Sequence, residues 1–184
     1  MWWRDLARVA RPAAALVLAG FAGACFQPLY GERTVTGSST VRDALAAVDI
    51  DQIDAPKGTA LSRIAVVTRN ELVFDMQGGS GQAPPTHKLV VRLVPGRTTI
   101  IQDPITLRNE FESFGLDANY RMVEIVSGKT VLTGSAITRV TYNVPGQEQR
   151  FARERGLRDA ETQAAKQIAD QIRSRLASYF VAGT

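Results

Sequence analysis

The sequence contains one cysteine and one histidine among 184 residues. A single cysteine excludes an intrachain disulfide and any multi-cysteine zinc or iron–sulfur site. A single histidine removes most catalytic and metal-binding arrangements that depend on imidazole. The sequence also has no G-x-S-x-G motif and no recognisable pair of catalytic carboxylates. We therefore expect a protein that is not an enzyme and that needs no cofactor or metal.

Extremes of composition are absent as well. Charged residues make up 22% of the chain and aromatic residues 7%, which argues against wholesale disorder. The length is typical of one domain that can bury its own core. The net charge falls from +4 to +2 if residues 1–24, with three arginines and one aspartate, are removed. Because no basic stripe with interleaved aromatic side chains remains, we expect no nucleic-acid partner.

The first 24 residues have the pattern of a signal peptide. Arg4, Arg8 and Arg11 precede an uncharged stretch dominated by alanine, leucine, valine and glycine, residues 12–24. A transmembrane helix needs about 20 apolar residues, so this stretch is too short to span a bilayer. It fits the apolar region of a signal peptide, and we predict that residues 1–24 are cleaved.

Cys25 directly follows the small residues Ala22-Gly23-Ala24 and resembles the cysteine of the bacterial lipoprotein lipobox. In that motif the thiol carries diacylglycerol and the new amino group is acylated, and several acyl chains hold a protein stably on a membrane. We therefore expect covalent N-acyl and S-diacylglycerol groups on Cys25. Two alternatives stay open, because Ala22-x-Ala24 is also an ordinary cleavage site that would leave Cys25 free, and Cys25 could instead be a buried structural residue of a retained segment.

The remaining chain divides into an N-terminal tether, residues 25–41, and a single domain, residues 42–184. The spacing of apolar residues predicts, in order, a strand at 47–53, a helix from Thr59 to about Phe74, a strand from His87 to Val94, and strands at 116–126 and 130–144. Thr59 is the expected N-cap of the helix. Pro95-Gly96 should end the strand before it, and Ser127-Gly128-Lys129 is typical of a hairpin link.

The last 30 or so residues change to a helical period. An amphipathic helix of about 25 residues is predicted by apolar side chains that recur every three or four positions, namely Leu157, Ala160, Ala164, Ile168, Ile172, Leu176 and Tyr179. The apolar stripe is narrow, so we expect this helix to pack on one surface, the sheet. The resulting fold class is α+β, with two helices packed on a mostly antiparallel sheet of about four strands.

Four arginines, Arg150, Arg153, Arg155 and Arg158, cluster where the last predicted strand gives way to the last helix. Guanidinium groups bind phosphate and carboxylate oxygens through paired hydrogen bonds. Cations at a helix N-terminus oppose the helix dipole slightly, so an anionic partner would offset a local cost. A solvated helix start is the alternative interpretation.

The run Cys25-Phe26-Gln27-Pro28-Leu29-Tyr30-Gly31 resembles the mature start of the LPS-assembly lipoproteins (LptE, formerly RlpB) in their short, alphaproteobacterial-like form, without the glycine that usually follows the cysteine. A weaker similarity of order and spacing extends over residues 25–180. It includes residues 61–63 and 69–72 of the predicted helix, Tyr120-Arg121-Met122, and the long terminal helix.

The resemblance implies a non-catalytic role. Such lipoproteins plug the LptD β-barrel, assist its assembly and contact lipopolysaccharide during delivery to the outer leaflet. The implied partners are LptD, lipopolysaccharide and, through the acyl anchor, lipid of the outer membrane, and Phe26 after the cysteine is compatible with that location. The alternative is a lipid-anchored periplasmic auxiliary component of a lipid-transport ABC system.

Basic residues of the family are thought to engage the lipid A phosphates. By similarity they correspond to positions near Arg108, between two predicted strands, and near Arg153, before the last helix; Arg155 belongs to the same arginine cluster. The hypothesis is that Arg153→Glu together with Arg155→Glu weakens lipopolysaccharide binding without unfolding the domain.

Overall fold

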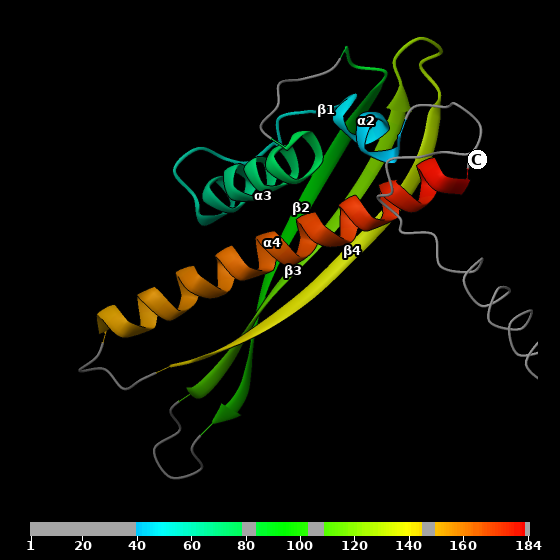
Figure 1. The fold of residues 1–184 in the computed structure, drawn as a ribbon. Coiled ribbons are helices and arrows are strands. Elements are labelled where there is room, and N and C mark those ends of the chain that lie inside the picture. The colour runs from blue at the N-terminus through cyan, green and yellow to red at the C-terminus, as the bar shows by residue number, and fades with distance from the viewer. Residues whose placement is uncertain (1–39, 79–83, 103–108, 145–149, 183–184) are drawn as a thin grey trace, which may run out of the picture. The chain divides into compact units, whose positions relative to one another are not determined.

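The structure, a computed structural model, describes residues 40–78, 84–102, 109–144 and 150–182. These residues form three helices and a four-stranded sheet (Figure 1). In chain order the elements are α2 (Val41–Ala46), β1 (Val48–Ile50), α3 (Ala60–Gln77), β2 (His87–Gln102), β3 (Asn109–Glu124), β4 (Thr130–Asn143) and α4 (Arg150–Ala182). The predicted α+β class, with two long helices on about four strands, is confirmed. The predicted signal peptide, Cys25 and nearly all of the predicted tether lie outside the described residues.

The sheet has the strand order β1-β2-β3-β4. Strand β1 runs parallel to β2 over three residue pairs, and β2, β3 and β4 form a long antiparallel meander. The hairpin between β3 and β4 is confirmed: Gly128 has φ 68°, which favours glycine, and its N–H donates to the carbonyl of Glu124 at 2.9 Å.

Strand β2 corrects one prediction, because it continues through Pro95 and Gly96 to Gln102. The reason is that β2 is an outer strand of the long meander, with β3 on one side only. The N–H of Asp51 donates to the carbonyl of Leu89, so the backbone groups of Leu89 point away from β3, and by alternation those of Pro95 do too. The N–H that proline lacks would therefore face outward, and the pairing with β3 survives.

Helix α3 begins as predicted, with Thr59 as its N-cap. The hydroxyl of Thr59 accepts a hydrogen bond from the N–H of Ser62, which satisfies one of the unpaired donors of the first turn. The helix runs one turn further than expected and ends at Gln77. The short helix α2 was not predicted from the sequence.

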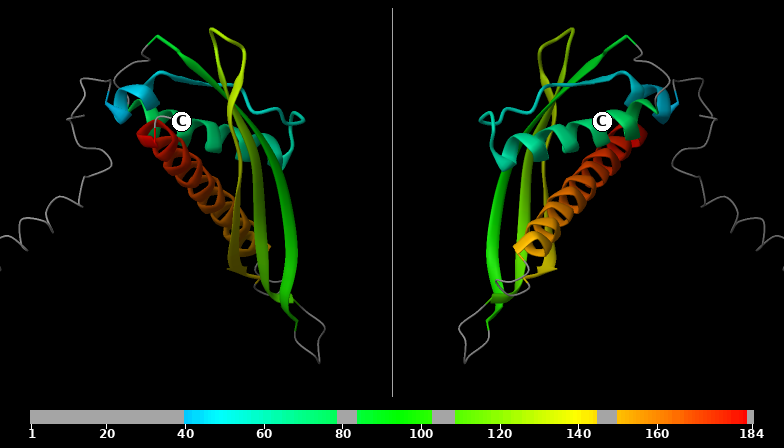
Figure 2. Two further views of the ribbon diagram at one scale, coloured as in Figure 1. Left: turned by 90° about the vertical axis from the view of Figure 1, so that its right-hand side faces the viewer. Right: turned by 90° about the vertical axis from the view of Figure 1, so that its left-hand side faces the viewer.

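Both long helices lie on the same face of the sheet (Figures 1 and 2). Apolar side chains at alternating positions of the strands are buried on this face, for example Leu89 of β2 and Leu116 of β3. Helix α4 contacts α3 as well as β3 and β4. The expectation of a narrow stripe against one surface was therefore incomplete, because small residues such as Ala165 and Ala169 widen the buried side of α4. The other face of the sheet carries no helix among the described residues.

Candidate functional site

The structure describes two of the four site residues predicted from the sequence. Cys25 and Arg108 lie outside the described residues. Arg153 and Arg155 both lie in the second turn of α4. Residues two positions apart on an α-helix point about 160° away from each other. The two arginines therefore do not form one site.

Arg153 points toward the sheet and binds a buried carboxylate. Its Nη2 lies 3.1 Å from Oε1 of Glu112, a β3 residue that is only 3% exposed. The hydroxyl of Tyr142, on β4, donates to the other oxygen of Glu112 at 2.5 Å. One carboxylate thus connects the start of α4 to the two neighbouring strands β3 and β4.

The register of the sheet places a further cation near this carboxylate, because Arg97 lies two residues before Thr99, which pairs with Glu112. Burial, together with the hydrogen bond to Glu112, raises the pKa of Tyr142 to about 12, while the positive charges of Arg97 and Arg153 oppose that rise. We refer to Arg97, Glu112, Tyr142 and Arg153 as the Glu112 cluster. With two guanidinium groups and one carboxylate, the cluster has a net positive charge.

A second buried carboxylate lies along α4, two turns further on. Glu161 is buried, and its Oε2 lies 3.3 Å from Nη2 of Arg63 on α3. Beside this pair is a groove of about 190 Å³, lined by Arg63, Ile64, Val67, Arg158, Glu161 and Thr162. Arg158 therefore faces α3, whereas Arg153 faces the sheet.

Arg155, like Arg150, lies at the surface of α4. It is exposed, and within the described ranges it has no ion pair or side-chain hydrogen bond. The four arginines at the start of α4 thus divide among different surroundings instead of gathering at one point. The hypothesis based on a double charge reversal needs a refinement, because Arg153→Glu would place a second carboxylate against buried Glu112.

The arrangement can bind anions, since its guanidinium groups combine charge with directed hydrogen-bond donors. Buried Glu112 would hold the Arg153 side chain in one place rather than neutralise the whole cluster. In the part of the chain that the structure describes, no group of three or more His, Cys, Asp or Glu side chains could hold a metal ion. No described helix combines the length and the apolar character needed to cross a membrane.

Sequence reasoning missed Glu112 and Glu161, although a signal for both exists. Glu112 occupies the same alternating face of β3 as buried Phe114 and Leu116. Glu161 interrupts the apolar stripe of α4 between Ala160 and Ala164. A carboxylate in a row of buried apolar positions requires a partner, because an unpaired buried charge is strongly unfavourable.

No protein-family model matches the chain, and no curated protein matches its sequence. Several solved structures are nevertheless similar in fold. One is a protein of Caulobacter crescentus CB15 assigned as a lipoprotein, with 17% identity, a TM-score of 0.59, and coverage of 78% of this chain and 97% of that chain.

Two further structures have the same arrangement. Rare lipoprotein B of Shewanella oneidensis matches with 16% identity, a TM-score of 0.52, and coverage of 73% of this chain and 96% of that chain. A minor lipoprotein of Acinetobacter baumannii matches with 11% identity, a TM-score of 0.51, and coverage of 73% and 93%. The described domain therefore has a fold that is also found in bacterial lipoproteins.

Proposed function

We propose that the protein is an outer-membrane lipoprotein that plugs the LptD β-barrel, assists its assembly and contacts lipopolysaccharide on its way to the cell surface. The proposal rests on two features that occur together in one chain. Residues 25–31 resemble the mature start of the LPS-assembly lipoproteins, and the domain that follows has the fold of rare lipoprotein B. In this arrangement the acyl groups on Cys25 hold the protein on the periplasmic side of the outer membrane.

The role of a plug accounts for the character of the candidate site. A plug requires surfaces for partners and not a reaction centre, so the protein is proposed to be neither an enzyme nor a cofactor-binding protein. The basic start of α4 would contact phosphate groups of lipopolysaccharide, with Arg153 held in place by Glu112 at 3.1 Å and Arg155 exposed. Guanidinium forks suit such oxygens because they donate two parallel hydrogen bonds.

A single charge reversal tests the contact with lipopolysaccharide. Arg155→Glu is expected to weaken binding of lipopolysaccharide to the purified protein about tenfold, because a charge-assisted hydrogen bond contributes about 1.5–3 kcal/mol. The matched control is Arg175→Glu, an equally exposed position near the other end of α4. Equal affinity of both variants and the wild type would discard Arg155 as a contact.

The anchor is tested separately by intact-protein mass spectrometry. The proposal predicts a mature chain that begins at Cys25 and carries the mass of diacylglycerol and an acyl group. A mature chain that begins at an unmodified Cys25 would contradict the lipid anchor, while leaving the fold unaffected.

A further inference from the structure

The face of the sheet opposite the helices is basic. We use the name open face for its central part, represented by Arg92 and Val94 of β2, Asp117 and Arg121 of β3, and Ile137 and Arg139 of β4. The register places Val94, Asp117 and Ile137 side by side across the three strands, and all alternate with buried positions of the helix-covered face. A solvated face is ordinary for an antiparallel sheet, so only the side chains it presents can indicate a partner.

The charges of the open face are unbalanced. Arg139 pairs with Asp117, with 2.5 Å between Nη1 and Oδ1. Arg92 and Arg121 are exposed, and neither has an ion pair within the described ranges. The register places them diagonally on neighbouring strands, because Arg92 lies opposite Asn119, two residues before Arg121. Two like charges so arranged repel each other, and a partner that carries carboxylates would remove this repulsion.

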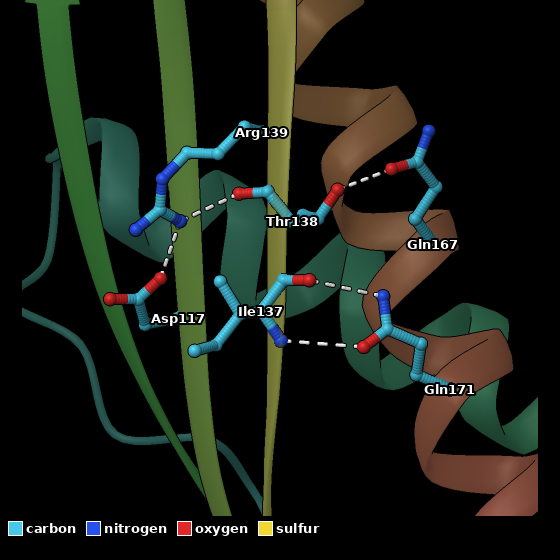
Figure 3. Close-up of polar contacts among 6 residues, drawn as sticks. All are labelled: Asp117, Ile137, Thr138, Arg139, Gln167 and Gln171. Carbon is cyan, nitrogen blue, oxygen red and sulfur yellow. Dashed lines mark hydrogen bonds and ion pairs between the residues drawn. The ribbon is translucent and has the colours of Figure 1, made fainter.

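At the centre of the open face the side chain of Arg139 is fixed in place. Arg139 lies across Gly115, where an added Cβ would stand 3.0 Å from its Cδ, Nε and Cζ atoms. Its guanidinium is held by Asp117 and by the carbonyl of Thr138 at 2.8 Å (Figure 3). Val94 and Ile137 flank Asp117 and are 52% and 58% exposed. Fixed charges beside two exposed apolar side chains suit another protein surface.

The edges of the sheet are obstructed near the open face. On β4, the side-chain amide of Gln171 pairs with both backbone groups of Ile137: it accepts from the N–H at 3.3 Å and donates to the carbonyl at 3.2 Å (Figure 3). On the other side, Pro95 of β2 has no N–H to offer. Both features disfavour addition of a strand at these two positions, so the open face is the better surface for a partner of this region.

We propose that the open face docks an acidic protein surface, whose carboxylates pair with Arg92 and Arg121. A membrane surface fits less well, because interfacial binding depends on several bulky apolar side chains. In the central part that defines the open face, the large exposed apolar side chains are Val94 and Ile137. The inference concerns the chemistry of the partner and does not depend on which protein it is.

Zero-length crosslinking in native membranes tests the proposal. In the full-length variant R92K/R121K the positive charges remain, and a carbodiimide can join each new amine to a carboxylate in direct contact. The matched control R42K/R175K carries the same changes on exposed positions of α2 and α4. We expect isopeptide bonds from position 92 or 121 to Asp or Glu of another protein, at least tenfold more abundant than from positions 42 and 175.

Three results would overturn the inference: no intermolecular bond at positions 92 and 121, an equal yield in the control, or bonds to a second copy of this chain only. The identity of the linked peptide separates this inference from the proposed function. A linked protein other than the barrel would support the acidic docking surface and contradict the plug. Recovery of the barrel without crosslinks at positions 92 and 121 would support the plug and contradict the acidic docking surface.

Discussion

The two ends of α4 are built on different principles. Toward its C-terminus, Ile168, Ile172 and Leu176 are fully buried against the sheet and α3. Toward its N-terminus, α4 is held by two ion pairs that involve buried carboxylates. Glu161 of α4 binds Arg63, and Glu112 of β3 binds Arg153. One helix therefore combines an apolar half with a half held by charged contacts.

Because the two ends of α4 differ in this way, one end can stabilise the domain while the other end takes part in recognition. Full burial of an aliphatic side chain contributes about 1.5–3 kcal/mol, whereas a buried ion pair contributes little net stability because desolvation offsets its attraction. The C-terminal half of α4 can therefore supply most of the stability that this helix contributes. The N-terminal end can then present guanidinium groups to a partner, as the proposed function requires.

The largest effect is expected in the apolar half. Ile172→Ala should lower the free energy of unfolding by about 2–5 kcal/mol, because it removes a fully buried side chain and leaves a cavity. Guanidinium unfolding followed by circular dichroism measures this change. Phe151→Ala is the control at the other end of the helix, where the side chain is 89% exposed, and should change stability by less than about 0.5 kcal/mol. Similar losses in both variants would refute the division of α4.

A smaller effect is expected at the Glu112 cluster. Tyr142→Phe removes the hydroxyl that donates to Glu112, and a hydrogen bond to a charged group contributes about 1.5–3 kcal/mol. Tyr179→Phe is the control, because the Tyr179 hydroxyl has no hydrogen bond among the described residues. Guanidinium unfolding at neutral pH measures the free energy of unfolding of both variants. If Tyr142→Phe were as stable as Tyr179→Phe, Tyr142 would not belong to the Glu112 cluster.

The same substitution changes the pH dependence of stability. Folding raises the pKa of Tyr142 from 10.0 to about 12, so the folded state favours the protonated phenol. The stabilisation is complete below pH 10 and is lost as the pH rises from about 10 to about 12. Unfolding curves at several values across this window should show a wild-type loss that is smaller in Tyr142→Phe, where Tyr120, whose pKa burial also raises, still contributes. Parallel curves would contradict the assignment.

The smallest effect is expected from the polar contact of the apolar half. Gln171→Ala exposes the backbone N–H and carbonyl of Ile137 to water, which should cost about 0.5–1.5 kcal/mol. It should also raise self-association, measured by sedimentation velocity, because an edge of the sheet is uncovered. The exposed Gln163→Ala provides the control. An unchanged sedimentation profile would show that Gln171 does not protect the edge.

Local patterns predicted much of the fold. They predict Thr59 as the N-cap of α3, a hairpin at Ser127-Gly128-Lys129, and a strand that begins at His87, and all three are confirmed. Each of these features depends on neighbouring residues in the chain. The fold class followed from their order.

Features that depend on distant residues could not be predicted in the same way. Strand β2 passes through Pro95 because of its place beside β3, which the residues around Pro95 do not specify. The ion pair between Arg153 and Glu112 joins positions 41 residues apart. Sequence spacing therefore predicted the arginine cluster, but it did not predict Glu112, the carboxylate that binds Arg153.

Co-purification from native outer membranes tests the central claim most directly. A tagged full-length chain, extracted in mild detergent, should bring down the LptD β-barrel in about equimolar amount, as identified by mass spectrometry. Recovery of the tagged chain with inner-membrane transporter components, or with no barrel partner, would contradict the account; the first of these results would favour an auxiliary subunit of a lipid-transport ABC system.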